Sequence, residues 1–264
     1  MDYRIEPSRL AGTVRIPGSK SHTIRALVCA LYAEGESVIR HPLVSADTLS
    51  ARKMVESLGA SVIDDGDIWR VRGGSIHIPS EMIDVGNSGT ALYFGIAAAA
   101  IAEGRIDFTG DHQICRRSAG PLLDALSALG VEVTSTEGCT PLSVHGPIKG
   151  GRASVRAVTS QYLSALLLST PLSSSDTIIE VPLLNEKPYV EMTLRWMERC
   201  GIEYEHDSFR EFRIPGGQKY KPFDIDIPAD FSSAAFFLVG GAITGGPITL
   251  EGLDYTDTQG DKRV

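Results

Sequence analysis

Apolar positions along the chain fall into long runs that alternate with amphipathic segments, and the alternation repeats. An apolar run of helical length follows each of four serines, Ser21, Ser88, Ser160 and Ser232, at steps of 67, 72 and 72 residues. A second series, Leu58, Leu129 and Cys200, closes amphipathic segments at two equal steps of 71 residues. Self-similarity at a fixed spacing predicts a repeat architecture.

Each unit has the same order of predicted elements. A serine-initiated apolar helix such as "SGTALYFGIAAAAIAEG" runs to a turn, and a strand such as "RIDFTG" follows. An amphipathic helix, "AGPLLDALSALG", then precedes a pair of strands in "VEVTSTEGCTPLSVHG". With a strand before the first helix, the unit is of βαβαββ type, with serine as the expected N-cap and glycine as the C-terminal stop.

The first helix of each unit is apolar nearly all round, which predicts burial on all sides. Three such helices can bury their apolar surfaces by packing against one another at the centre, with the sheets outside. The fold class is therefore α/β, a pseudo-threefold domain over residues 13–229, with 1–12 and 230–264 forming part of a second domain. A fourth unit begins at "DFSSAAFFLVGG", but its next Leu-Gly step would fall near position 271. We therefore expect the chain to be a fragment of a longer protein.

The composition excludes several functional classes. The 264 residues are 42% hydrophobic and 22% charged, with a net charge of −8, which argues against nucleic-acid binding. The four cysteines stand singly, away from any metal-ligand spacing, and are expected to be free thiols. The longest apolar run is too short to span a bilayer, and the first ten residues lack the apolar core of a signal peptide. We expect a cytoplasmic protein without a membrane or nucleic-acid partner.

The segment "IPGSKSHTIRAL" places Lys20 at a predicted helix start. The spacing argues against a P-loop, because five residues separate Gly12 from Gly18 and Ser19 precedes the lysine. Two interpretations of Lys20 stay open: an anion site at the helix N-terminus, or a solvated lysine on the surface. If three repeats share one orientation, the starts "GSKS", "GNSGT" and "TSQYL" converge, with Lys20, Arg25 and one arginine of "CRRS" as the cations.

Other polar residues have simpler interpretations. His22 and His112 are expected to be satisfied or solvated side chains, since no catalytic triad or metal cluster can be identified. Asp230 is either a helix N-cap or a site carboxylate, and the cap is favoured.

Five segments, in this order, resemble the enolpyruvyl transferases. They are "GTVRIPGSKSHTIRAL", "GNSGTA", "TSQYLSALL", "EKPYVEMTL" and "PADFSSAAFFLVGGAITGG". The resemblance covers nearly the whole chain and favours the branch that uses shikimate 3-phosphate, because the branch that uses UDP-N-acetylglucosamine usually has Gly-Ala-Lys-Asn at the first segment.

The resemblance implies an inside-out α/β barrel in each of two domains, with the active site between them. It implies transfer of an enolpyruvyl group from phosphoenolpyruvate to the 5-hydroxyl of shikimate 3-phosphate, in aromatic amino-acid biosynthesis, through a tetrahedral intermediate. No metal or organic cofactor is implied, and the full-length protein would be a monomer.

The resemblance also assigns residues to ligands, with Lys20 as the catalytic residue shared by both substrates. The residues assigned to shikimate 3-phosphate are Lys20, Ser21, Arg25, Thr159, Ser160, Gln161 and Tyr189. Those assigned to phosphoenolpyruvate are Lys20, Asn87, Gly89, Arg117 and Gln161.

Four residues depart from the family pattern: Ile24, Tyr93, Ser118 and Glu186. Tyr93 stands where an arginine is common and removes a positive charge. Glu186 stands where a serine contacts the substrate phosphate, and we expect its carboxylate, which would repel a phosphate, to turn outward. Such departures leave two alternatives open, a non-catalytic anion-binding module on the same scaffold or a relative of the UDP-N-acetylglucosamine enzyme. For the chain alone, the expectation is weak binding of shikimate 3-phosphate without turnover.

Overall fold

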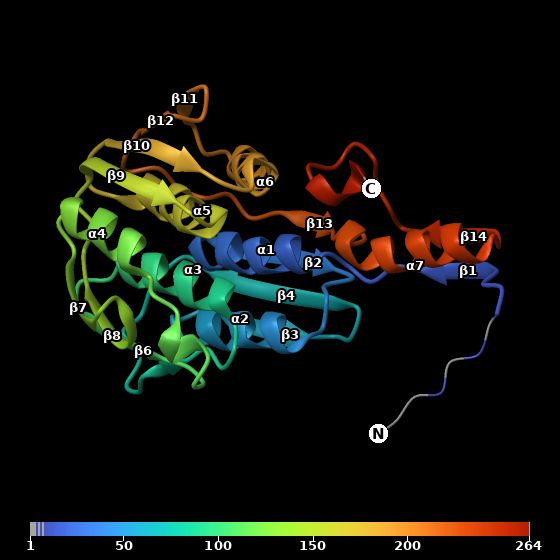
Figure 1. Cartoon of the computed structure of the whole chain (residues 1–264). Helices are drawn as coiled ribbons and strands as arrows, with labels where there is room; N and C mark the ends of the chain where they lie inside the picture. The colour runs from blue at the N-terminus through green and yellow to red at the C-terminus, as the bar shows by residue number, and fades with distance from the viewer. Residues whose placement is uncertain (1–3, 5, 7, 264) are drawn as a thin grey trace.

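Three four-stranded sheets surround a layer of helices in the computed structural model, which describes residues 4, 6 and 8–263 (Figure 1). The strands of these sheets are β2 (Gly35–Arg40), β3 (Ser61–Asp64), β4 (Ile68–Gly73), β5 (Ile83–Asp84), β6 (Arg105–Thr109), β7 (Glu132–Thr136), β8 (Cys139–His145), β9 (Gly151–Ala157), β10 (Thr177–Leu184), β11 (Glu205–Asp207), β12 (Glu211–Ile214) and β13 (Asp224–Asp226). The α-helices among them are α1 (Lys20–Tyr32), α2 (Ala46–Ser57), α3 (Gly89–Ala99), α4 (Gly120–Ala128), α5 (Ser160–Ser169) and α6 (Lys187–Arg199). Two 3-10 turns, η1 (Ile114–Arg116) and η2 (Thr170–Leu172), complete this part of the chain.

All three sheets have one topology. Their strand orders are β13-β2-β4-β3, β5-β6-β8-β7 and β9-β10-β12-β11. In each, the first pair is parallel and the other two pairs are antiparallel. In chain order the second and third sheets with their helices read βαβαββ, so the repeat predicted from the spacing is confirmed for these two units.

The first unit differs from the sequence expectation at its first strand. The segment before α1 forms β1 (Gly12–Arg15), which pairs in parallel with β14 (Ile248–Glu251) in a separate two-stranded sheet. β13, from the other end of the three units, takes the vacant place beside β2. Residues 13–15 therefore lie with the C-terminal segment, whereas the predicted boundaries, 13–229 for the first domain, stay a prediction.

The apolar helices α1, α3 and α5 form the centre of the molecule. Every residue of α1 from His22 to Tyr32 is buried, and only Thr90 in α3 and Gln161 in α5 are less than fully buried. α3 packs against both α1 and α5, and Tyr32 joins α1 to α5 through a 2.9 Å hydrogen bond to Ser169. All-round apolar character thus correctly predicted central burial.

The start of α3 agrees with the serine of the repeat, Ser88, whereas α1 and α5 start two residues and one residue earlier than Ser21 and Ser160 suggested. The N-caps of α1, α3 and α5 are Ser19, Ser88 and Thr159. Ser21 and Ser160 therefore lie within the first helical turn, so a cap role for them was wrong.

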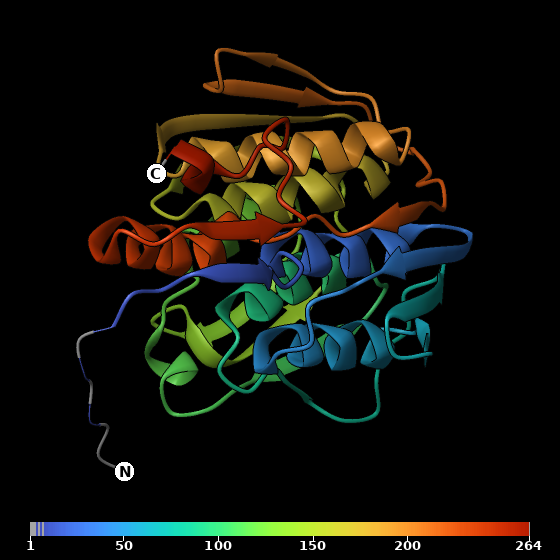
Figure 2. The same ribbon diagram turned by 90° about the vertical axis from the view of Figure 1, so that its right-hand side faces the viewer.

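The fourth apolar helix, α7 (Phe231–Thr244), extends away from this core alongside β1 and β14 (Figures 1 and 2). Asp230 is its N-cap and accepts a hydrogen bond from the Ser233 N–H at 3.1 Å, as favoured from the sequence. Of its own residues only Phe231 and Ala234 are buried, and Phe236 is 80% exposed. Among the described residues, no helix is both long enough and apolar enough to cross a bilayer.

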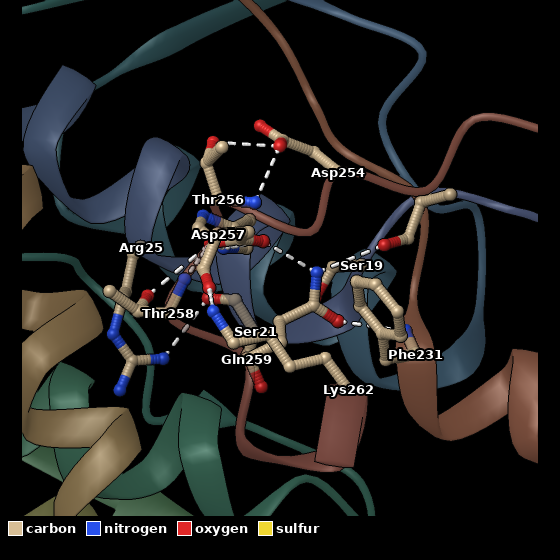
Figure 3. Close-up of polar contacts among 12 residues, drawn as sticks. Ser19, Ser21, Arg25, Phe231, Asp254, Thr256, Asp257, Thr258, Gln259 and Lys262 are labelled. Atoms are coloured by element: carbon tan, nitrogen blue, oxygen red, sulfur yellow. Dashed lines mark hydrogen bonds and ion pairs between the residues drawn. The ribbon is translucent and has the colours of Figure 1, made fainter. Parts of the chain in front are cut away.

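The segment that ends in the 3-10 turn η3 (Gly260–Arg263) is anchored to α1 and α6 through Asp257 (Figure 3). The carboxylate of Asp257 lies 3.0 Å from His22 Nε2, and Trp196 donates to the other ring nitrogen of His22 at 3.0 Å. Thr258 and Gln259 also donate to this carboxylate. His22 is therefore a satisfied buried side chain, as predicted.

This anchor predicts a pH-dependent contribution to stability. Burial by itself would raise the pKa of the Asp257 carboxyl, but hydrogen bonds from His22, Gln259 and the Thr258 N–H outweigh it and lower the pKa from 3.8 to about 2. A pKa lower in the folded state stabilises the fold above about pH 4, and this stabilisation is lost as the pH falls towards 2. We expect Asp257→Asn to reduce the free energy of unfolding by about 2 kcal/mol at pH 7.

Urea unfolding measured between pH 7 and pH 2 checks this expectation. The difference in free energy of unfolding between the unmodified chain and Asp257→Asn should become smaller below about pH 4. Asp124→Asn, on the exposed face of α4, is the matched control and should change stability by less than about 0.5 kcal/mol. An equal loss at every pH would contradict the assignment.

Candidate active site

The N-termini of the three central helices meet at a polar hollow of about 350 Å³. Lys20 and Gly89 are the first residues of α1 and α3, and Gln161 is the second residue of α5. The hollow is lined by Lys20, Asp47, Asn87, Gly89, Thr90, Gln113, Arg117 and Gln161. Helix N-termini present unpaired N–H groups and the positive end of the helix dipole, so their convergence favours an anion.

Lys20 holds its ammonium group at the edge of the hollow. Its Nζ lies 3.6 Å from a carboxylate oxygen of Asp47, in the first turn of α2, and the side chains are 47% and 35% exposed. A half-exposed pair of this kind contributes little to stability. The ammonium group therefore remains available to a ligand.

Arg117 supplies the second cation of the hollow, directly after η1. Of the two arginines in "CRRS", only Arg117 lines the hollow. A Cβ atom at Gly89 would lie 3.3 Å from Arg117 Nη1, so the glycine permits the guanidinium group to approach the start of α3 closely. Within the described part of the chain Arg117 forms no ion pair, which leaves its N–H groups free for an anion such as a carboxylate or phosphate.

The amide groups of the hollow differ in how they are satisfied. Asn87 Nδ2 donates to Gln113 Oε1 at 3.2 Å. Gln161 Oε1 is enclosed by protein and accepts no hydrogen bond among the described residues. An unpaired enclosed acceptor is costly, so this oxygen requires a donor such as a hydroxyl group of a ligand or a water.

Arg25 lies one turn into α1 and is only 2% exposed. Its guanidinium group donates to Thr193 Oγ1 at 2.8 Å and to the carbonyl oxygens of Ser21 and Tyr189, both at 3.1 Å. It also lies over the ring of Phe94, 5.4 Å from the centroid. Burial lowers the pKa of Arg25 from 12.5 to about 10. The predicted contact of Arg25 with a ligand carboxylate stays a prediction.

At the start of α5, the structure overturns one sequence expectation. Glu186 does not turn outward: its Oε2 accepts hydrogen bonds from the Ser160 N–H at 3.1 Å and the Ser160 hydroxyl at 2.9 Å. Thr159 Oγ1 donates to the same oxygen at 3.4 Å. The reason is physical, since a helix N-terminus attracts a carboxylate as readily as it attracts a phosphate.

The predicted site residues thus fall into three groups. Lys20, Asn87, Gly89, Arg117 and Gln161, the whole set assigned to phosphoenolpyruvate, line one hollow. Thr159 and Ser160 hold Glu186, whereas Ser21 and Tyr189 offer backbone carbonyls to Arg25. The ligand roles of all these residues stay predictions.

Three lining residues, Asp47, Thr90 and Gln113, were not identified from the sequence. Asp47 lies within the capping box of α2, between Ser45 and Thr48, and an acidic residue in a first helical turn is normally explained by the helix dipole. Gln113 lies in a loop without a recognisable pattern. Only Thr90 carried a signal, because it is adjacent to Gly89 in "GNSGT".

The other departures from the family pattern have local explanations. Ile24 is fully buried in α1. Tyr93 is 6% exposed and makes an edge contact with Tyr162, with ring centroids 4.9 Å apart. Ser118 Oγ accepts a hydrogen bond at 3.1 Å from the N–H of Gly120, the first residue of α4. These side chains serve packing and local hydrogen bonding.

Comparisons with known proteins all give one family. A family model described as EPSP synthase (3-phosphoshikimate 1-carboxyvinyltransferase) matches residues 5–264. A 3-phosphoshikimate 1-carboxyvinyltransferase of Acetivibrio thermocellus is 50% identical over 268 residues, which cover 100% of this chain and 63% of the relative. The corresponding protein of Ruminiclostridium cellulolyticum is 46% identical, with 100% and 64% covered.

A solved structure shows the same fold. The EPSP synthase of Acinetobacter baumannii superimposes with a TM-score of 0.83 at 25% identity, over 94% of this chain and 57% of the other. The chain spans slightly less than two thirds of the length of the curated relatives it matches. The matched family model, the identity along the whole chain and the shared fold confirm that this chain belongs to the EPSP synthase family.

Proposed function

We propose that the hollow around Lys20 binds phosphoenolpyruvate and that shikimate 3-phosphate binds beside it, towards the N-terminus of α5. The single observation that carries the proposal is the convergence of three helix N-termini with Lys20 and Arg117 in one hollow. The reaction would be the one named for the relatives, transfer of the 1-carboxyvinyl group to the 5-hydroxyl of shikimate 3-phosphate.

The chemistry of the ligands supports this assignment. Phosphoenolpyruvate carries a carboxylate and a phosphate, and the hollow offers an arginine suited to paired contacts and a lysine suited to a point charge. The unpaired Gln161 Oε1 would accept a hydrogen bond from a ring hydroxyl of the second substrate. These local groups can bind anions although the chain carries a net charge of −8.

Lys20 would act on both substrates. Over the whole reaction, the 5-hydroxyl oxygen forms a bond to C2 of phosphoenolpyruvate, the bond from C2 to the phosphate oxygen breaks, and the released phosphate takes up the proton of the hydroxyl. A cation fixed in the hollow stabilises the negative charge that moves onto the departing phosphate. Lys20 can supply this cation because its side chain is 47% exposed and its ammonium group lies at the edge of the hollow, 3.6 Å from Asp47.

For the 264 residues alone we propose binding without turnover, because they correspond to 63% of the length of the relative from A. thermocellus. The four cysteines, which are free thiols, support a reducing compartment such as the cytoplasm.

Calorimetric titration with each substrate, together with an assay of phosphate release, tests the proposal. Saturable binding of shikimate 3-phosphate and of phosphoenolpyruvate supports it. Absence of binding by either substrate at millimolar concentration refutes it. Binding of inorganic phosphate with no preference for either substrate would instead support the non-catalytic anion-binding module. Phosphate release at rates typical of enzymes, about 1 to 1000 per second, would refute the statement on turnover.

A further inference from the structure

The donors at the start of α5 are already occupied by an anion, the carboxylate of Glu186. One oxygen of this carboxylate accepts three hydrogen bonds, from the backbone N–H and hydroxyl of Ser160 and the hydroxyl of Thr159, at 3.1, 2.9 and 3.4 Å. A backbone N–H and two hydroxyls at the positive end of a helix form a donor set that suits phosphate as well as carboxylate.

The loop before α6 holds the carboxylate in this place. Asn185 is tied to the end of β9 and the residue after it by two hydrogen bonds, from its N–H to Ala157 O at 3.0 Å and from its Nδ2 to Val158 O at 3.1 Å. Glu186 itself has a φ of +57°, a left-handed conformation that is unfavourable for a residue with a side chain. Although it is the N-cap residue of α6, its side chain makes no cap hydrogen bond to that helix. The side chain of Glu186 is therefore directed at α5.

Within the described part of the chain no cation pairs with Glu186. The neighbouring Lys187 points elsewhere, with its Nζ 4.2 Å from the centroid of the Phe209 ring and 3.6 Å from a carboxylate oxygen of Glu191. The donors of α5 are thus the only described partners of the Glu186 carboxylate. A second anion could use these donors only by displacing the carboxylate, because two like charges cannot share one set of donors without strong repulsion.

We infer that Glu186 is an internal competitor for the phosphate group of the ligand, and so lowers the preference of this site for phosphorylated over unphosphorylated ligands. The inference rests on the proposed function for the identity of the ligand. The competition itself is independent of the proposed function, because any phosphate that uses the Ser160 and Thr159 donors must displace the carboxylate of Glu186.

Replacement of Glu186 tests this inference. Calorimetry gives the dissociation constants of shikimate 3-phosphate and of unphosphorylated shikimate for the unmodified chain, Glu186→Gln and Glu186→Ser. We expect both variants to bind shikimate 3-phosphate at least about tenfold more tightly, a gain of about 1.4 kcal/mol. Binding of shikimate should change by less than about twofold. The matched control is Glu191→Gln, one turn further along α6 and paired with Lys187, which should leave both constants unchanged.

A titration with inorganic phosphate separates this inference from the proposed function. The amide resonance of Ser160, followed by NMR, should reach saturation at about a tenfold lower phosphate concentration in the Glu186 variants. If phosphate behaves in this way but shikimate 3-phosphate binds no better than phosphate, the competition holds and the proposed substrate is wrong. If the Glu186 variants bind phosphate and shikimate 3-phosphate no more tightly than the unmodified chain, the competition is wrong. A gain of equal size for shikimate also contradicts it, since shikimate has no phosphate to compete.

Discussion

Replacing Lys20 by methionine is expected to weaken the binding of phosphoenolpyruvate by about 10- to 150-fold, because a hydrogen bond to a charged group contributes about 1.5 to 3 kcal/mol. The loss should be this large because Lys20 and Arg117 are the only cations that line the hollow within the described residues. Methionine keeps the length and most of the apolar stem of the side chain. Calorimetric titration at fixed ionic strength is the measurement.

Stability should hardly change in this variant. The pair of Lys20 with Asp47 is 3.6 Å long and half-exposed, and such pairs contribute less than about 1 kcal/mol. The matched control is Lys219→Met, because Lys219 is 75% exposed and pairs with Glu34 away from the hollow. An equal loss of affinity in the two variants would show that the net charge of the chain, rather than the hollow, governs binding.

The second large effect is expected on stability, from Phe94→Ala in the middle of α3. Phe94 is 1% exposed and lies against the guanidinium group of Arg25. Removing a buried phenyl ring loses its transfer free energy and leaves a cavity, which together cost about 3 to 5 kcal/mol. Loss of the ring also removes a cation–π contact from a buried charge.

Phe236→Ala in α7 is the same substitution at a site that is 80% exposed. This control should change the free energy of unfolding by less than about 0.5 kcal/mol. Urea unfolding of both variants gives the comparison. The slope of the free energy of unfolding against urea concentration should equal that of the unmodified chain. A loss below about 1 kcal/mol for Phe94→Ala would mean that α3 is not part of the central core in solution.

Much of the architecture could be predicted because it depends on periodic patterns. The equal steps to Leu58, Leu129 and Cys200 record three equivalent helix ends, and an apolar run without a polar face has no alternative to burial. The partner of β1 could not be predicted in this way. A short alternating strand such as β1 can form hydrogen bonds with β2 or with β14. The choice between these two partners depends on contacts between distant parts of the chain.

Only part of the candidate site, likewise, could be predicted from the sequence. Lys20, Gly89 and Gln161 each stand in the first turn of a central helix in successive units, so their convergence followed from the repeat. The orientation of Glu186 did not follow from the repeat, because it depends on a contact with the N-terminus of α5 from a residue 26 positions away in the chain. Asp47 was missed because it belongs to α2, outside the three central helix starts.

The strand β13 sets the order in which the sheets can be completed during synthesis on the ribosome. The second and third sheets are each made from one continuous stretch of chain, residues 83–145 and 151–214. Three strands of the first sheet are present by residue 73, but the fourth begins only at Asp224. Until that strand emerges, β2 has an open edge with unpaired N–H and C=O groups, which is a site for mispairing. Of the three four-stranded sheets, the first to be made is therefore the last to close, and a nascent chain halted before residue 224 would be the form most in need of a chaperone.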